Sequence, residues 1–154
     1  MRLSRKSDYA LRALFTLVEF YGRGPVSLNE LARRNNVPKR FLEHIMLALK
    51  RQGWVVSAPG CKGGYELARP PERITMGEVV RHFDGLLAPI GCVSVSAHEP
   101  CSQSETCRFR RVLLEIRNHT TRVMDGATLA AVFGNRPVAA HEVFAPDLSG
   151  GEGI

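Results

Sequence analysis

Residues 27–53 read SLNELARRNNVPKRFLEHIMLALKRQG, and this stretch decides the fold. Ser27 and Glu30 have the spacing of a capping box, in which each side chain accepts a backbone N–H at the start of a helix. Pro38 suits the first turn of a second helix, because its missing N–H would have no partner there. The stretch therefore predicts two short helices joined by a tight turn, as in a helix-turn-helix.

The flanking segments extend this motif. Apolar residues at helical spacing predict a first helix over residues 7–21, and Thr75 begins a second capping box that predicts a short helix ending near residue 84. WVVS (54–57) and YELA (65–68) flank a loop rich in Gly and Pro, which predicts a β-hairpin. We therefore expect a mainly α fold, in which residues 1–84 form a winged helix-turn-helix DNA-binding domain with a small β-hairpin wing.

The rest of the chain divides into three segments. Residues 85–107 form a polar loop that contains three cysteines, and residues 108–135 hold a long amphipathic helix and a short final helix. The apolar stripe of the long helix needs a second surface, and the same helix of a second chain is the simplest one, so we expect a homodimer. Residues 136–154 have no periodicity and predict a flexible tail. The stripe comprises Phe109, Val112, Leu113, Ile116, Thr120 and Val123.

The positive charge is concentrated in the N-terminal half. The 154 residues have a net charge of +6; residues 1–73 hold 14 Lys and Arg against 6 Asp and Glu, whereas residues 74–154 hold 7 against 9. This distribution favours a nucleic-acid partner for the N-terminal half, although a merely basic soluble domain would have the same composition.

Several other classes of protein are not expected. The chain has no phosphate-binding loop, nucleophile elbow or paired carboxylates, which argues against an enzyme. It also has no long apolar run and no signal-peptide cleavage site, so we expect a cytoplasmic protein without a membrane partner.

The cysteines are the candidate metal ligands. Residues 92–107 read CVSVSAHEPCSQSETC and contain three of the four cysteines. In a reducing cytosol such clustered thiols are metal ligands or redox groups more often than structural disulfides. Soft thiolates suit an iron–sulfur cluster, and His98 could complete a Cys3His zinc site. Cys61 lies apart in the hairpin loop, either as a passive residue or as a thiol whose oxidation would alter DNA contact.

SDYALR (7–12), the helix-turn-helix, GCKGGYELAR (60–69) and three cysteines before a long helix together resemble the IscR, NsrR and RirA family of bacterial iron–sulfur winged-helix transcription regulators. The resemblance covers about residues 1–133. It implies that Cys92, Cys101 and Cys107 hold a 2Fe–2S or 4Fe–4S cluster whose state controls DNA binding by a homodimer.

The resemblance also bears on the fourth ligand. The 2Fe–2S members have a histidine three residues after the last cysteine, where this chain has Arg110. Members that sense nitric oxide use the aspartate of SDYALR from the partner subunit, which implies Asp8 here and favours 4Fe–4S over 2Fe–2S. His98 is the runner-up. Without a ligand role, Asp8 would simply place a favourable negative charge at a helix N-terminus.

The candidate DNA contacts follow from the helix-turn-helix and the wing. Lys39 and Arg40 open the second helix of the pair, where side chains reach base edges or phosphates in the major groove of double-stranded operator DNA. The other candidates are Ser27, whose helix N-terminus suits a phosphate, Glu43, which could accept from cytosine or be a solvated charge, Lys62 for phosphate, and Gly63, which permits close approach of the wing.

Two other functions stay open. The first is a winged-helix regulator without a cluster that senses thiol oxidation or a small metabolite. The second is a metal-binding interaction module or electron carrier without a DNA function. For a cluster-sensing regulator, the signal could be nitric oxide, iron supply, cluster supply or redox stress.

Overall fold

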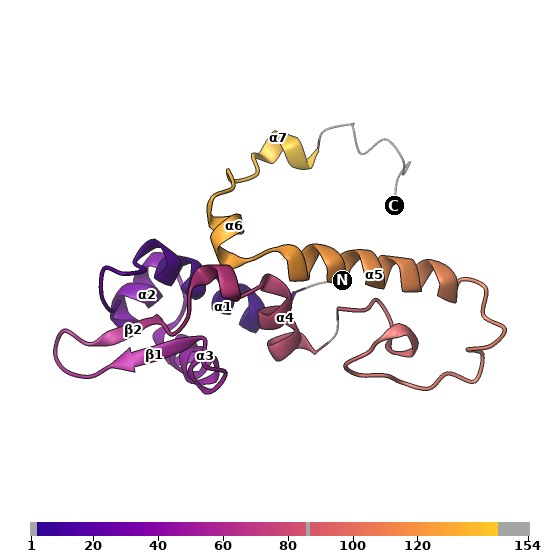
Figure 1. Ribbon diagram of the computed structural model, residues 1–154, viewed down its shortest axis with the longest axis horizontal. Helices are drawn as coiled ribbons and strands as arrows, with labels where there is room; N and C mark the ends of the chain where they lie inside the picture. The colour runs from indigo at the N-terminus through magenta and orange to yellow at the C-terminus, as the bar shows by residue number, and fades with distance from the viewer. Residues whose placement is uncertain (1–2, 86, 145–154) are drawn as a thin grey trace.

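The computed structural model describes residues 3–85 and 87–144, which form a mainly helical protein with one two-stranded antiparallel sheet (Figure 1). The order of elements confirms the predicted winged helix. The N-terminal part comprises α1 (Arg5–Glu19), α2 (Leu28–Asn35), α3 (Lys39–Arg51), β1 (Val55–Ala58), β2 (Gly64–Leu67), the short 3-10 helix η1 (Pro71–Arg73) and α4 (Met76–Asp84). A second 3-10 helix, η2 (Gly91–Val93), α5 (Arg110–Gly126), α6 (Leu129–Phe133) and α7 (Ala140–Val143) follow.

The helices of the winged part begin at side-chain caps. Ser4 caps α1, which begins and ends two residues earlier than the apolar pattern predicts. The Ser27 hydroxyl accepts the Glu30 N–H at 3.2 Å, but the Glu30 carboxylate binds arginines instead of returning to Ser27, so only half of this predicted capping box forms. The capping box of Thr75 and Glu78 is complete.

The turn between α2 and α3 depends on Asn36. This residue adopts a left-handed conformation with φ of 51°, which asparagine tolerates better than most residues. The chain then turns back at once, and the Val37 N–H donates to the Ala32 carbonyl at 3.0 Å. The tight turn fixes the angle at which α3 leaves α2.

The core of the winged part is built around α1, which contacts α2, α3, α4, α6 and β2. Complete burial of such side chains contributes about 1.5–3 kcal/mol each to folding. The largest fully buried apolar side chains are Leu14, Leu17, Leu31, Leu42, Met46, Leu49, Val55, Ile74, Val79, Val80 and Leu129.

The wing is a short hairpin to which a third segment is hydrogen-bonded. β1 and β2 pair from Val55 with Leu67 to Ala58 with Gly64. Val26, just before α2, exchanges two backbone hydrogen bonds of 2.9 Å with Tyr65. A Cβ on Gly64 would collide with the Val26 carbonyl, so glycine at this position permits the close approach. The wing is therefore attached directly to the start of the helix-turn-helix.

The C-terminal end of α5 is attached to the start of α4. The Met76 N–H donates to the Ala127 carbonyl and the Leu129 N–H donates to the Ile74 carbonyl, both at 2.9 Å. Leu129 is fully buried in the main core. From this attachment α5 runs away from the wing, and the cysteine loop lies at its far end (Figure 1).

The predicted tail contains a short helix where the structure describes it. The Glu142 carboxylate accepts the Ala139 N–H at 2.9 Å and pairs with Arg136 at 3.0 Å, which stabilises the single turn of α7. Residues 145–154 of this predicted segment lie outside the described residues. None of the helices in residues 3–85 and 87–144 has the length and hydropathy of a membrane span.

Candidate DNA interface and cysteine site

The predicted DNA contacts on α3 lie on its exposed face. Lys39 and Arg40 occupy the first turn and Glu43 the next, and all three are exposed. The opposite face, which includes Leu42 and Ile45, is buried in the core. The exposed side chains are therefore carried by a helix whose orientation is fixed by packing.

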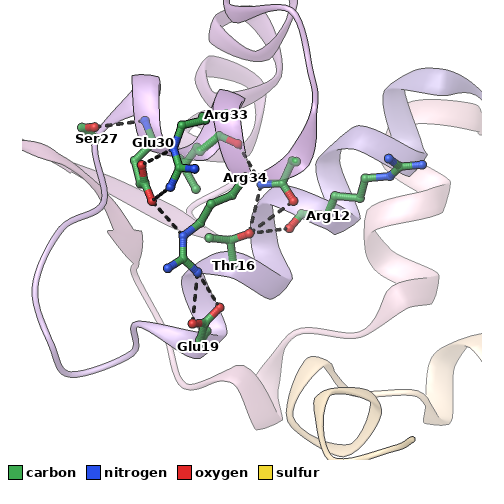
Figure 2. Close-up of polar contacts among 9 residues, drawn as sticks. Arg12, Thr16, Glu19, Ser27, Glu30, Arg33 and Arg34 are labelled. Carbon is green, nitrogen blue, oxygen red and sulfur yellow. Dashed lines mark hydrogen bonds and ion pairs between the residues drawn. The ribbon is translucent and has the colours of Figure 1, made fainter. Parts of the chain in front are cut away.

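An ion-pair network joins α2 to α1 (Figure 2). Glu30 accepts hydrogen bonds from Arg33 at 2.8 Å and from Arg34 at 2.9 Å, and Arg34 also binds Glu19 on α1 at 2.9 Å. The hydrogen bonds from Arg33 and Arg34 lower the pKa of Glu30 to about 2. Arg34 also lies over the ring of Phe20 at 4.7 Å. Arg33 is the more exposed of the two arginines.

The tip of the wing faces the start of α2 across a groove of about 460 Å³, which Ser27, Arg34, Cys61, Lys62 and Gly63 help to line. Ser27, Cys61 and Lys62 are exposed. A Cβ on Gly63 would collide with the Ala58 carbonyl of the same hairpin. Gly63 is thus required by the turn itself, whatever its distance from DNA.

The structure brings together two of the three loop cysteines. Cys92, 8 % exposed, and the half-buried Cys107 line one cavity of about 430 Å³ at the N-terminal end of α5, and His98 lines it too. Cys101 is exposed and does not line this cavity. Within residues 3–85 and 87–144, no three His, Cys, Asp or Glu side chains are grouped closely enough to hold a metal ion.

Arg110 holds the loop that carries these cysteines. Its guanidinium donates to the Cys92 carbonyl at 2.9 Å and to the Ser104 carbonyl at 3.0 Å. Arg111 and Arg117 also line the cavity. Thiolates and the clusters they bind carry negative charge, so the chemistry of this donor set and its cationic wall fits an iron–sulfur cluster, although Cys101 would have to move to join it.

Asp8 lies in the first turn of α1, away from the cysteine cavity of its own chain. Its carboxylate pairs with Arg12 one turn later at 2.8 Å and is 41 % exposed. The side chain is therefore accessible to a second molecule, and its role as a ligand stays a prediction.

One part of the predicted apolar stripe of α5 packs against the cysteine loop, and the other part is exposed. Leu113 packs with Leu114 against Ala88, Cys92 and Val93. The other large apolar side chains of the stripe, Phe109, Val112, Ile116 and Val123, are each about half exposed or more. These four residues define the exposed stripe of α5.

The contacts that Glu30 and Arg110 make at these surfaces were not predicted from the sequence. Glu30 has the i,i+3 and i,i+4 spacing to Arg33 and Arg34 that predicts ion pairs on a helix, and this signal could have been used. The bonds of Arg110 to carbonyls 6 and 18 residues earlier have no such signal, because they depend on the path of the loop.

Comparison with known proteins agrees with this architecture. Residues 3–135 match the family model of Rrf2, described as an iron-dependent transcriptional regulator. The chain is 38 % identical over 133 residues to a putative rrf2-like HTH-type transcriptional regulator of Rhodobacter capsulatus, covering 82 % of this chain and 89 % of that protein. It is 32 % identical over 121 residues to the HTH-type transcriptional regulator CymR of Bacillus subtilis, covering 79 % and 86 % of the two chains.

Solved structures show the same fold. The structure of CymR, the global cysteine regulator of B. subtilis, superposes with a TM-score of 0.74 at 28 % identity and covers 89 % of this chain and 99 % of that one. The structure of T. potens IscR gives a TM-score of 0.68 at 27 % identity and covers 99 % and 94 %. The predicted family resemblance is thus confirmed.

Proposed function

Because the chain belongs to the Rrf2 family of DNA-binding transcription regulators and is not an enzyme, we propose that it acts in the cytosol as a homodimer whose binding to operator DNA is controlled by an iron–sulfur cluster. One observation carries the proposal. Cys92 and Cys107 line a cationic cavity at one end of α5, while the other end of α5 is hydrogen-bonded to the winged helix. A change at the cysteines therefore has a direct structural route to the DNA-binding part.

The DNA contacts are proposed for three surfaces. Lys39, Arg40 and Glu43 on α3 would enter the major groove, because they project from the first turns of the second helix of the motif. The N-terminus of α2 at Ser27 would bind a backbone phosphate, since its free N–H groups and helix dipole favour an anion. Lys62 at the wing tip, next to Gly63, would contact phosphate. Pro59, three residues before Lys62, has no charged side chain that could read the minor groove.

The homodimer is proposed to form through the exposed stripe of α5. Phe109, at the N-cap of α5, and Val112, Ile116 and Val123 on this 17-residue helix are spaced three, four and seven residues apart and are each about half exposed or more. An exposed apolar strip of this kind is typical of an association surface. The same strip of a second copy is its complement under two-fold symmetry.

The cluster ligands are proposed to be Cys92, Cys101 and Cys107, with Asp8 of the partner subunit as the fourth. When bound, the cluster supplies a redox- and ligand-sensitive group that ties three loop thiolates together. This chain's own residues hold the loop through Arg110 and balance its charge through Arg111 and Arg117. The Asp8 carboxylate favours a 4Fe–4S cluster, whereas a 2Fe–2S cluster would move the fourth ligand to His98.

The test is anaerobic purification followed by native mass spectrometry and an absorption spectrum of the dimer. We expect the mass of one 4Fe–4S cluster per subunit, lost in the single Ser variants of Cys92, Cys101 and Cys107 and in Asp8→Ala. Cys61→Ser is the matched control and should keep the cluster, because Cys61 lies in the wing. A colourless dimer that carries zinc or no metal would overturn the cluster assignment. It would not contradict the assignment as a DNA-binding regulator.

A regulator without a cluster is the second candidate, and the separation of the cysteines favours it. Cys101 is exposed and stands apart from the cavity that Cys92 and Cys107 line, so its thiol is accessible to an oxidant on its own. Such a protein would respond to thiol oxidation or to a small metabolite. Its signature would be a metal-free dimer whose operator affinity changes with an oxidant and no longer does so after Cys101→Ser.

A further inference from the structure

A second cavity lies beside the cysteine cavity, between α4, the loop that follows it and α5. Its volume is about 290 Å³, and Leu87, Ala88, Ser94, Val95, Arg117 and Thr121 are among the residues that line it. This volume is at the low end of the range for small-molecule sites, about 300–1,000 Å³. The cavity contains none of the four cysteines, so the proposed cluster does not account for it.

Arg117 supplies an uncompensated donor at this cavity. Its Nε is buried and has no hydrogen-bond partner in the part of the chain that the structure describes. A buried donor without a partner is unfavourable, and charged groups are affected most. The guanidinium of Arg81, which also lines the cavity, already forms an ion pair with Asp125 at 2.6 Å. Arg117 is thus the side chain with hydrogen-bonding capacity to offer a ligand.

The remaining wall is mainly apolar. Leu87 and Ala88 are buried behind the cavity, whereas Val95 is 82 % exposed although it lines the same space. An apolar group in the cavity would cover Val95 and remove its side chain from water. The hydroxyls of Ser94 and Thr121, which also line the wall, can donate hydrogen bonds to a carboxylate.

We propose that this cavity binds a small organic anion, a carboxylate on a short apolar body. The carboxylate pairs with Arg117, and the apolar body lies against Leu87, Ala88 and Val95. Arg117 and Thr121 are one helical turn apart on the side of α5 that faces the loop. None of the four residues of the exposed stripe of α5 is among the described residues that line the cavity.

The position of the site connects it to the cysteines. Arg117 and the segment Ser94–Val95 line both cavities, and this segment begins two residues after Cys92. An anion bound to Arg117 would hold that segment in place and fix the position of Cys92. The site goes beyond the proposed cluster function and does not depend on it.

The probe for this site is isovalerate, a carboxylate with a short branched apolar tail, titrated into the full chain by isothermal calorimetry, with metal content measured on the same samples. We expect one isovalerate per subunit. Arg117→Gln should weaken binding about tenfold or more, because it removes a charge-assisted hydrogen bond. Arg122→Gln is the matched control, since Arg122 is an exposed arginine on the same helix that does not line the cavity.

Two further probes keep the result interpretable. Isovaleramide has the same shape without the charge and should not bind, and inorganic phosphate has the charge without the apolar body and should bind more weakly than isovalerate. Leu87→Gln, which leaves Arg117 in place, should also weaken isovalerate if the apolar wall contributes. The proposal is overturned if isovalerate does not bind, if the two arginine variants behave alike, or if isovaleramide or phosphate binds as well as isovalerate. Because Arg117 also lines the cysteine cavity, the metal content measured on each variant separates loss of isovalerate binding from loss of the cluster.

Discussion

The winged helix and the cysteine loop are held together by different forces. In the winged part a continuous apolar core joins α1–α4, the hairpin and α6. In the described part of the loop, Ala88, Cys92 and Val93 form a small buried apolar group against Leu113 and Leu114. Arg110 adds two hydrogen bonds to loop carbonyls. A packed core resists small changes, whereas a loop held by a few polar contacts can rearrange locally. The difference suits a rigid reader of DNA joined to a responsive segment.

The largest expected effect comes from removing apolar volume from each of the two regions. Leu42→Ala empties space in the core, where Leu42 is fully buried, and should lower the free energy of unfolding by about 2–5 kcal/mol. Val93→Ala in the loop should lower it by less than about 1 kcal/mol, because the loop opens without global unfolding. Urea denaturation followed by far-UV circular dichroism measures both. Leu47→Ala, at a position 42 % exposed on α3, is the control, and equal losses in core and loop would contradict the contrast.

A second test concerns the junction between the regions. A Cβ on Gly77 would collide with the carboxylate of Asp125, which itself pairs with Arg81. Gly77→Ala should therefore destabilise the protein by about 1–3 kcal/mol through overpacking. Gly126→Ala is the matched control in α5, where a new Cβ meets no atom within 4 Å, and it should be neutral or stabilise by up to about 1 kcal/mol. Thermal unfolding distinguishes the two, and a harmless Gly77→Ala would show that the junction has room to adjust.

A third test loosens the loop alone. Arg110→Gln removes the donors to the Cys92 and Ser104 carbonyls, so amide hydrogen exchange over residues 92–107 should accelerate by about tenfold or more. Exchange in α1 and α3 should not change. Arg111→Gln, at an exposed neighbour, is the control. Acceleration throughout the winged helix would mean that the loop and the core open together.

The smallest effect concerns the charge network of α2. Because Arg33 and Arg34 lower the pKa of Glu30 to about 2, the ionised carboxylate stabilises the fold fully above pH 4.5, its ordinary pKa, and this contribution is lost as the pH falls from 4.5 through 2. The stability difference between the wild type and Glu30→Gln should be constant near neutral pH and shrink over that acidic interval. Glu43→Gln on α3 is the control. A difference that is independent of pH would show that the network does not stabilise the ionised form.

Local signals account for what could be predicted from the sequence. Ser27, Asn36 and Pro38 act on their immediate neighbours, so the helix ends that they determine could be read along the chain. The partner of Glu30 could not be decided in this way, since its carboxylate had a choice between the Ser27 N–H and two arginines. The arginines prevail because Arg33 binds the carboxylate through two nitrogens, and both guanidinium groups carry a full positive charge that a backbone N–H lacks.

The residues of the cysteine site could be predicted from the sequence, but their positions relative to one another could not. Thiol chemistry made Cys92, Cys101 and Cys107 candidates, yet no periodic pattern in the loop distinguishes the buried Cys92 from the exposed Cys101. Their positions follow from long-range contacts, above all those of Arg110 and Leu113, which a one-dimensional pattern does not contain. The proposed role of Asp8 as a ligand in the partner subunit is tested by native mass spectrometry of Asp8→Ala.

The attachment of α5 to the start of α4 makes this helix a lever arm. Two backbone hydrogen bonds and the buried Leu129 fix its C-terminal end as the pivot, or fulcrum, and the cysteine loop lies at its other end. A helix of 17 residues is about 25 Å long, so a tilt of about 10° at the fulcrum displaces the far end by about 4 Å. The same geometry works in reverse: a displacement of about 4 Å at the loop corresponds to a rotation of about 10° beside the DNA-reading helices.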